Sequence, residues 1–364
     1  MNGIKTFFAV VSLVLLASPA FSASWLECNG DSGKKLRWSG NSTSARINTI
    51  SFSGSNLTAA QRGIDMTNTN PSPFNINRTT ETGGVGSGNG QNEIYAQNIS
   101  PPGVAKMRYH CYWLFGWHYG LDEVDIVLDT SISWTSSQAK TSNSAYTGTR
   151  SPIDAVIVHE AGHYLGLMHV NSEYNVMGDS WRHHHTNGST ARSYFGEDAS
   201  HGARTLYGDQ SSSFRDVSVS HWRRTGSSGE YSSHGRVRVR NSANNGTLAG
   251  ITINGEPGFR VTRGTTVRPE FTIENNGKQS HANVQYGIYI STNDTISTSD
   301  RRIGGGVFGN IHPANVMTTT VPVYIPTDLN AGQDYWLGII LDENNVISEV
   351  SESNNKTYTP VRVQ

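Results

Sequence analysis

The chain has 364 residues, enough for two or three domains of roughly 100 to 200 residues each. Its 28 basic and 29 acidic side chains nearly balance, so net charge does not favour a nucleic acid or an anionic membrane as partner. With 38 glycines and an abundance of Ser, Thr and Asn, the composition favours short strands and turns over long surface helices.

The first residues have the pattern of a secretory signal peptide. Lys5 precedes an apolar run from Phe7 to Ala17, and small residues end the segment at Ser22. The apolar run is too short to span a bilayer comfortably, and no later part of the sequence is apolar enough to do so. We therefore expect cleavage after residue 22 and a soluble, secreted chain, either extracellular or periplasmic.

Cys28 and Cys111 are the two cysteines of the chain. In an oxidising compartment an even number of cysteines favours pairing, so we predict one disulfide between them. This bridge would tie the mature N-terminus to the middle of the first domain. A free thiol with a role of its own at Cys28 is the less favoured alternative, because only a few residues would precede it.

From residue 25 to residue 208 the sequence mixes strand-like and helical patterns, which predicts an α+β domain. In the first helical pattern Asn56 or Thr58 can cap the N-terminus, and Gly208 offers a stop for the last one. The strand-like runs are 45–52, 104–115 and 123–129, and the helical patterns are 56–68, a stretch around 156–166, and 196–208.

Two further regions follow. Residues 209–250 are rich in Ser, Gly and Asn and are predicted to be a linker with one strand that can join either neighbour. Alternation in that strand places Arg236, Arg238 and Arg240 on one face, which we expect to be solvated. Residues 251–364 contain about seven strand-like runs separated by turn residues, which predicts an immunoglobulin-like β-sandwich.

The runs "TIENNGKQSHANVQYGIYISTNDTISTSDRRIG" and "LDENNVISEVSESNN" carry a characteristic turn, strand end and acidic terminal pattern. In these features the segment resembles the bacterial cell-adhesion-related (CARDB) domain. The resemblance covers nearly all of residues 251–364 and implies an accessory module. A surface or matrix polymer is the partner that we would expect for it.

The stretch "VIVHEAGHYLGLMHVNSEYNVMGD" places candidate metal ligands at fixed offsets. On a helix His159 and His163 stand about 40° and 6 Å apart, so both imidazoles can reach one ion. Gly166 lets the chain leave the helix and turn back, which delivers His169 as a third ligand. Three neutral imidazoles with an open fourth position describe a catalytic zinc site.

Glu160 stands beside the first ligand, where it can act as general base toward a water in the open position. The alternative is an amphipathic helix whose histidines make only local hydrogen bonds. Five specified residue types in the right order favour the catalytic interpretation.

The motif H-E-x-x-H-x-x-G-x-x-H resembles that of the metzincin superfamily of zinc peptidases. The resemblance implies that Met177, eight residues beyond His169, forms the hydrophobic floor called the Met-turn. Together with "DIVLDTSISW" and "EDASHGARTLYG", this spacing is similar to the matrixin branch. It implies that residues 23–208 form a metzincin catalytic domain, a twisted mixed sheet carrying the active-site helix and one zinc ion.

Two departures from the matrixin pattern bear on whether the chain binds a second zinc ion or calcium. Val127 stands where vertebrate matrixins carry a histidine ligand, so we infer no second zinc. The glycine-rich loop that helps to hold structural zinc and calcium is missing. Calcium (Ca2+) therefore stays unsupported, with Asp125 and Asp129 as the candidate ligands.

Two predictions concern substrate binding. The strand residues Asp125, Ile126, Val127 and Leu128 are predicted to form the sheet edge along which an extended peptide adds. The run His183 to His185 has three open interpretations: it lines the pocket for the residue after the cut bond, binds adventitious metal, or lies in a solvated loop.

Two hypotheses of function follow. The first is a secreted, monomeric zinc metalloendopeptidase that cuts proteins or peptides. The second is an adhesive or scaffold protein in which the sandwich binds a polymer and the zinc domain is vestigial. The intact Glu160 favours the first hypothesis, since a vestigial site has no physical need for a general base.

Overall fold

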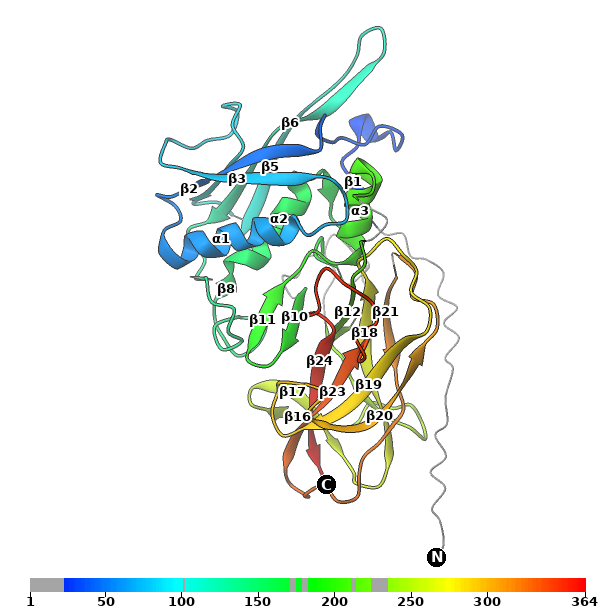
Figure 1. Cartoon of the computed structure of the whole chain (residues 1–364). Helices are drawn as coiled ribbons and strands as arrows, with labels where there is room; N and C mark the ends of the chain where they lie inside the picture. Colours follow the sequence, from blue (N-terminus) through cyan, green and yellow to red (C-terminus); the bar gives the residue numbers. More distant parts are fainter. Residues whose placement is uncertain are drawn as a thin grey trace, which may run out of the picture.

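The computed structural model describes residues 23–100, 102–170, 175–178, 183–210, 214–223, 235–313 and 315–364. The predicted signal peptide lies outside these residues. Two bodies lie against each other, an N-terminal one with a sheet and helices and a C-terminal β-sandwich (Figure 1). Within the described ranges no helix is long and apolar enough to cross a membrane.

The N-terminal body is built on a five-stranded sheet. Its strands are β2 (Ser42–Asn48), β3 (Asn75–Glu81), β4 (Glu93–Gln97), β5 (Gly103–Trp113) and β6 (Trp117–Asp129). The order across the sheet is β3-β2-β4-β6-β5, and all neighbours are parallel except β5, which runs antiparallel to β6. This is the mixed sheet expected of the α+β domain.

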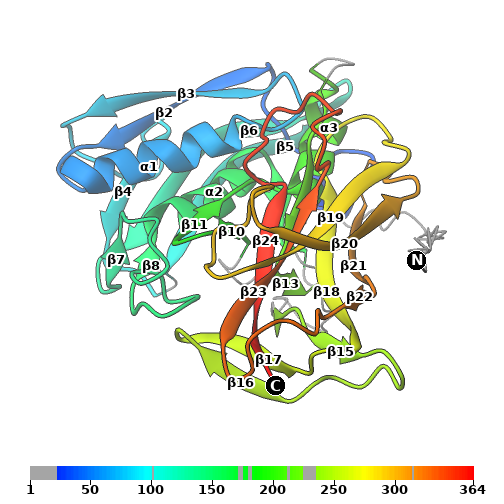
Figure 2. The same ribbon diagram turned by 60° about the horizontal axis from the view of Figure 1, so that its bottom comes forward.

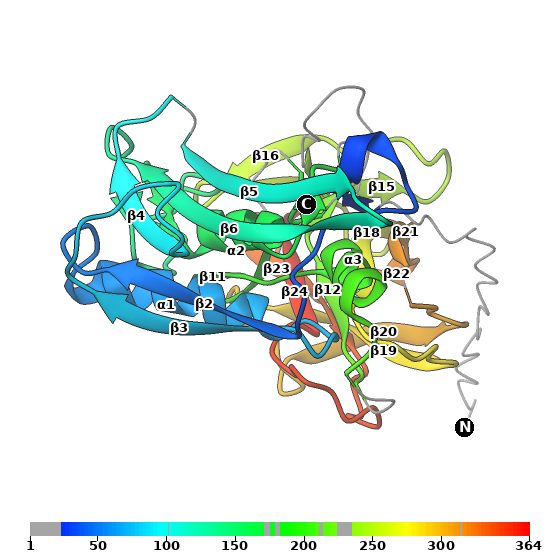
Figure 3. The same cartoon turned by 90° about the horizontal axis from the view of Figure 1, so that it is seen from above.

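Helices α1 and α2 lie side by side on one face of this sheet (Figures 1 and 3). Ser53 has extended backbone and directly precedes α1, so the prediction that Asn56 or Thr58 caps this helix is wrong. A Cβ on Gly63 of α1 would lie 2.6 Å from the Ile157 side chain, which shows how closely the two helices pack. The helices are α1 (Gly54–Thr67), α2 (Ile153–Tyr164) and α3 (Glu197–Tyr207).

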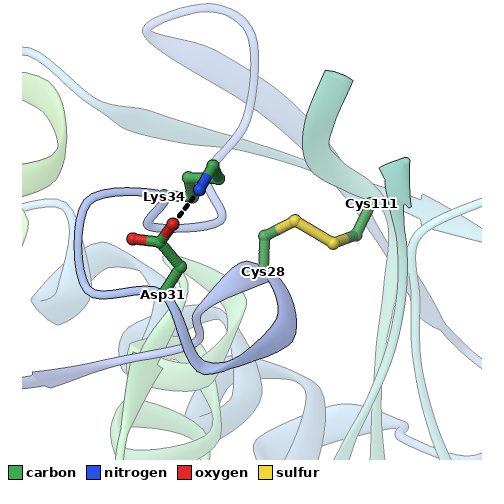
Figure 4. Close-up of a disulfide and its surroundings, with 4 residues drawn as sticks. All are labelled: Cys28, Asp31, Lys34 and Cys111. Carbon is green, nitrogen blue, oxygen red and sulfur yellow. Dashed lines mark hydrogen bonds and ion pairs between the residues drawn. A yellow bond between two sulfur atoms is a disulfide. The ribbon is translucent and has the colours of Figure 1, made fainter. Parts of the chain in front are cut away.

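The predicted disulfide joins Cys28 to Cys111, with the two Cα atoms 5.6 Å apart (Figure 4). It ties a short 3-10 turn at Cys28–Gly30 to the outer half of β5. Beyond the disulfide, β5 and β6 continue as a hairpin that projects from the body (Figure 1). The remaining short strands here are β1 (Ser24–Trp25), β7 (Trp134–Thr135), β8 (Ser151–Pro152) and β9 (Leu167–Met168).

The C-terminal body consists of two packed sheets around an apolar core that includes Phe271, Ile288 and Leu337. One sheet has the order β16-β17-β24-β23-β19-β20, and in the other β18 pairs with β21 and β22. Each strand-like run predicted after residue 251 falls on one or two of these strands. They are β16 (Gly250–Ile253), β17 (Glu256–Val261), β18 (Thr266–Asn275), β19 (Val284–Ser291), β20 (Arg301–Phe308), β21 (Val316–Thr320), β22 (Val323–Tyr324), β23 (Asp334–Leu341) and β24 (Lys356–Val363).

The region 209–250, predicted to be a linker, contributes strands to the sandwich. β12 (Val217–Ser220) and β15 (Val239–Asn241) both pair with β18. β13 (Trp222–Arg223) and β14 (Gly235–Arg236) pair with each other. The one strand predicted in this region, around Arg236 to Arg240, falls on β14 and β15, whereas β12 and β13 are too short to show the alternation by which a strand is recognised in a sequence.

The prediction of a solvated arginine face in this region is also wrong for two of the three side chains. Arg236 forms an ion pair with Glu256 at 3.0 Å, and Arg240 forms one with Glu270 at 2.6 Å. Arg238 is exposed. The two glutamates are buried, so the arginines compensate charges inside the sandwich rather than facing water.

A β-hairpin of the N-terminal body forms much of the contact between the two bodies (Figure 2). Its strands are β10 (His184–Asn187) and β11 (Thr190–Ser193). Asn187 exchanges two hydrogen bonds with the backbone of Ile296, and Gly188 N–H donates to Asp294 O at 2.7 Å. Nearby Lys140, which is 7% exposed, bonds Glu256 at 2.8 Å and Asp294 at 2.6 Å. The sandwich is thus fastened to the first body by specific, buried polar contacts.

Candidate metal centre

Helix α2 is buried on almost every face. Of its residues only His159 is partly exposed, and the others pack against α1, β5 and β6. Burying polar groups such as Glu160 and His163 in these surroundings costs free energy unless they find partners. The partners that they have define the site.

The side chains of His159, His163 and His169 converge on one point. Their Nε2 atoms lie 3.2 Å apart for His159 and His169, and 3.0 Å apart for His163 and His169. Three nitrogens at about 2.0 to 2.1 Å from one tetrahedral zinc ion would lie about 3.3 Å from each other. Within the described residues, this is the one group of three or more potential ligands whose atoms all lie within 4.8 Å of one another.

Hydrogen bonds to backbone carbonyls fix the tautomer of two of these histidines. His159 Nδ1 lies 2.6 Å from Val176 O, and His163 Nδ1 lies 2.8 Å from Leu167 O. Because a carbonyl oxygen only accepts, each Nδ1 carries the proton and donates it. In the neutral ring Nε2 then has a lone pair that points toward the other two histidines. A cation at the point where these lone pairs meet would stabilise the arrangement.

Burial keeps these rings neutral. It lowers the pKa of His159 to about 4, and it lowers the pKa of His163 as well, with the neighbouring histidines adding to the effect. Metal ligation requires the unprotonated nitrogen. The donor set, its tautomers and its spacing therefore fit a zinc ion.

The chain reverses direction at Gly166, where φ is +94°. A Cβ at this position would lie 2.5 Å from the carbonyl oxygen of Leu36, so both the conformation and the close approach require glycine. The last carbonyls of α2 are satisfied by Trp38, whose Nε1 donates to Tyr164 O, and by Tyr207, whose hydroxyl donates to Leu165 O. This tight turn carries His169 back toward the helix.

Met177 lies beneath the helix and is 1% exposed. A Cβ on Gly162 would overlap its sulfur atom, so the glycine between Glu160 and His163 is what lets the methionine approach. Val170 N–H donates to Met177 O at 3.1 Å, which ties this turn to the residue after His169. In the sequence, the signal for this role of Gly162 is a small residue on the helix face opposite Glu160.

Glu160 is 5% exposed and lies next to the start of β5. Burial raises the pKa of its carboxyl group to about 8, an effect that the Ala105 N–H opposes by donating a hydrogen bond. A Cβ on Gly103 would lie 3.0 Å from Glu160 Oε1, so only glycine leaves this carboxylate uncrowded. The Glu160 carboxyl group thus lies against the start of β5, one residue along the helix from His159.

The predicted substrate strand is not at the edge of the sheet. Residues Asp125, Ile126, Val127 and Leu128 belong to β6, which pairs with β4 on one side and β5 on the other, and all four are fully buried. The edge strands of this sheet are β3 and β5, and β5 is the one next to β6. The error arose because β6 is the more regular apolar run, and a continuous apolar run indicates a strand buried within the sheet rather than an edge.

The two candidate calcium ligands are engaged by the protein itself. Asp125 accepts a hydrogen bond from the Glu93 N–H, and burial raises the pKa of its carboxyl group to about 7. Asp129 accepts bonds from the backbone and hydroxyl groups of Ser131. Neither belongs to a group of three converging ligands in the part of the chain that the structure describes.

The run His183 to His185 is buried between the two bodies, so its interpretation as a solvated loop is wrong. The three residues are 2%, 1% and 6% exposed. His183 stacks on Tyr194 and lies 3.6 Å from Glu274, whereas His184 contacts Asn143. The three rings have different neighbours and do not converge, so the described contacts do not resemble those of the first cluster.

Two regions of the chain match models of known families. Residues 116–208 match the family model described as Matrixin, and residues 251–359 match the one described as CARDB. The chain therefore carries a matrixin region followed by a CARDB domain. The first match includes all three histidines and indicates a metallopeptidase. No curated protein matched the chain.

Solved structures similar to this chain include CARDB domains. One is the crystal structure of a CARDB domain from Pyrococcus furiosus in complex with di-metal ions. It is 16% identical to this chain, and the match covers 42% of this chain and 90% of that one with a TM-score of 0.25. Another is a domain of a putative cell surface protein from Methanosarcina acetivorans, at 21% identity, 27% and 75% coverage and a TM-score of 0.21.

Proposed function

We propose that this protein is a secreted, zinc-dependent metalloendopeptidase with Glu160 as general base. The observation that carries the proposal is the buried carboxyl group of Glu160, which directly follows His159 in a cluster of three converging imidazoles. The matrixin match supports the same class of enzyme. The disulfide fits an oxidising compartment and so supports export, with residues 1–22 as a cleaved signal peptide.

A zinc ion held by His159, His163 and His169 would polarise the scissile carbonyl and acidify a water molecule. Glu160 would take the proton of the attacking water and pass it to the nitrogen of the leaving amine. The rigid hydrogen bonds of His159 and His163 to backbone carbonyls would hold the ligands in place during these steps.

We propose β5, rather than β6, as the strand beside which an extended peptide binds. Among the described residues β5 pairs with β6 alone, and its first residues, Gly103 and Ala105, lie beside Glu160. Backbone hydrogen bonds to this edge would place a peptide carbonyl near the histidine cluster whatever the side chains of the substrate. This accounts for an endopeptidase that acts along extended segments of protein.

The domain boundaries also change. We propose a catalytic unit over residues 23–208 and a sandwich that begins near residue 214, because β12 already belongs to it. In this arrangement the sandwich supports the catalytic unit through the β10–β11 hairpin. Binding of a surface polymer by the sandwich is a separate property that does not follow from this contact.

The test compares casein hydrolysis by the wild-type chain, by Glu160→Ala and by the matched exposed carboxylate variant Glu352→Ala. Glu160→Ala should bind one zinc ion per chain and lose turnover, whereas Glu352→Ala should keep both. A chelator should abolish wild-type activity, and zinc should restore it. Full activity in Glu160→Ala would refute the mechanism.

A further inference from the structure

The hairpin at the outer ends of β5 and β6 gathers most of the exposed apolar side chains of the described chain. Seven of its twelve exposed large hydrophobic residues lie between residues 109 and 119. Phe115 at the turn is 96% exposed. We call residues 109–119 the aromatic hairpin; its exposed members are Tyr109, Tyr112, Trp113, Leu114, Phe115, Trp117 and Tyr119. Exposed apolar groups concentrated in this way mark an interaction site.

The exposed rings lie on both faces of the hairpin. Trp113 is opposite Trp117, and Tyr112 is opposite His118 in the next pair of residues. Successive residues of a strand point to opposite faces, so the two pairs are on different sides. A folded protein or a flat polymer chain would cover one side and leave the other in water. A fluid apolar phase surrounds a projecting hairpin on both sides.

The side chains are also ordered by polarity from the turn inward. Leu114 and Phe115 at the apex have no polar atom, the Trp113 and Trp117 pair follows, and then come Tyr112 and His118. At about 3.3 Å per residue, Tyr112 lies about 10 Å behind the apex. Proteins that bind at a bilayer surface bury apolar groups about 5 to 10 Å deep and place amphipathic rings at the headgroups.

The base of the hairpin is tied to the body by the disulfide, and the two carboxylates that lie there are paired, Asp31 with Lys34 and Asp122 with His110. Cys111 is bonded to Cys28, and the Lys34 ammonium lies 4.4 Å from the centre of the Trp117 ring (Figure 4 shows the disulfide and Lys34). From residue 103 to residue 121 the sequence contains no Asp or Glu. Lys34 is itself paired with Asp31, so insertion rather than charge would drive binding.

We propose that the aromatic hairpin inserts its apex into the surface of a lipid bilayer and so holds the secreted chain on a membrane. Leu114 and Phe115 enter the apolar boundary, and the Trp and Tyr rings lie among the headgroups. This role is independent of peptide hydrolysis, because the hairpin apex contains none of the residues of the metal centre.

The test is flotation of the full chain with vesicles of phosphatidylcholine, alone or mixed with phosphatidylglycerol. The wild type should float with both kinds, and added salt should change this little. Leu114→Ser combined with Phe115→Ser should lower the partition coefficient by about 10-fold or more. The control, Ile50→Ser combined with Val346→Ser, removes two side chains that are 77% and 71% exposed elsewhere and should partition like the wild type.

Three results would overturn the proposal. They are absence of flotation, equal flotation of the apex and control variants, and hairpin-dependent binding to an insoluble polysaccharide without binding to vesicles. Self-association in the absence of lipid that the apex variant abolishes, with no flotation, would assign the hairpin to a second copy of the chain instead. Unchanged thermal unfolding of the apex variant verifies that it is folded, and no result depends on peptidase activity.

Discussion

The chain contains two clusters of three histidines, which are alike in composition but differ in how their rings are arranged. In the first, His159, His163 and His169 present their Nε2 atoms to one point, with Nδ1 atoms of two of them held by backbone carbonyls. In the second, His183 to His185 are consecutive, lie between two bodies and have separate neighbours. Convergence of lone pairs, and not the number of histidines, distinguishes a metal centre.

The second cluster belongs to an interface that has a different purpose. Around it lie buried charges that cross between the bodies, above all Lys140 with Glu256 and Asp294. These contacts fix the position of the sandwich against the β10–β11 hairpin. The comparison predicts that substitutions in the first cluster remove metal and activity, whereas those in the second lower stability.

The largest expected effect is that of His163→Ala. Loss of one of three ligands should lower zinc affinity by more than the roughly 10- to 100-fold typical of an outer-shell change, and hydrolysis with it. His184→Ala should keep its zinc. Metal content after dialysis and casein hydrolysis measure both. Equal zinc loss in the two variants would mean that the clusters are not functionally distinct.

Next in size is Lys140→Ala. Removing one partner of a buried charge pair leaves the other uncompensated and costs about 3 to 5 kcal/mol of the free energy of unfolding. Denaturant titration measures this loss. The control is Lys278→Ala, whose pair with Asp209 is about one third exposed and should contribute about 0 to 1 kcal/mol. A loss no greater than that of the control would contradict the specified interface.

Gly162→Ala should cost about 1 to 3 kcal/mol, because the added methyl group overlaps the Met177 sulfur. Since Met177 and His159 are linked through the same turn, zinc affinity should fall as well. Thermal unfolding with and without chelator separates the two effects. An alanine variant as stable as the wild type would show that the turn is free to move away.

The pH dependence of stability sharpens the contrast for the second cluster. Burial lowers the pKa of His184 to about 3 and that of His185 to about 4. Above pH of about 6.5 both states are neutral and these groups contribute nothing. As pH falls below that value the unfolded chain takes up protons that the folded chain does not, so each histidine lowers stability by about 1.4 kcal/mol per pH unit.

This slope is measured by the free energy of unfolding of the wild type and of His185→Gln between about pH 6.5 and about pH 4. Asp216, whose pKa is raised to about 6 by burial, and Glu349, whose pKa is raised to about 8, act with the opposite sign over part of the range. Both carboxyl groups are present in the wild type and in the variant, so the difference between their two curves of unfolding free energy against pH gives the contribution of His185. Parallel curves would mean that His185 is not buried in the folded chain.

The smallest expected effect is that of Met177→Leu. A swap of similar volume in a packed site costs less than about 1.5 kcal/mol. Because the methionine touches the helix and not the reacting atoms, turnover should change less than thermal stability. A variant of wild-type stability that has lost turnover would instead assign Met177 a direct part in the reaction.

What could be predicted from the sequence depended on local patterns. The spacing of His159, His163 and His169 follows from helix geometry and one glycine, so the histidine cluster was recognisable without a structure. The alternation of β17 to β24 likewise identified the sandwich strands. The disulfide followed from the presence of two cysteines in a chain with a secretory pattern.

Relations between distant segments were decided only by the tertiary structure. Whether β6 or β5 forms the edge depends on which strands pair, and the apolar run at Ile126 indicates a buried strand without identifying its neighbours. β12 and β15 gain their strand character from β18, because strands this short have no stability alone. The buried environment of Lys140 and of His183 to His185 exists only because the sandwich packs there, since burial is a property of the folded surroundings and not of the residue.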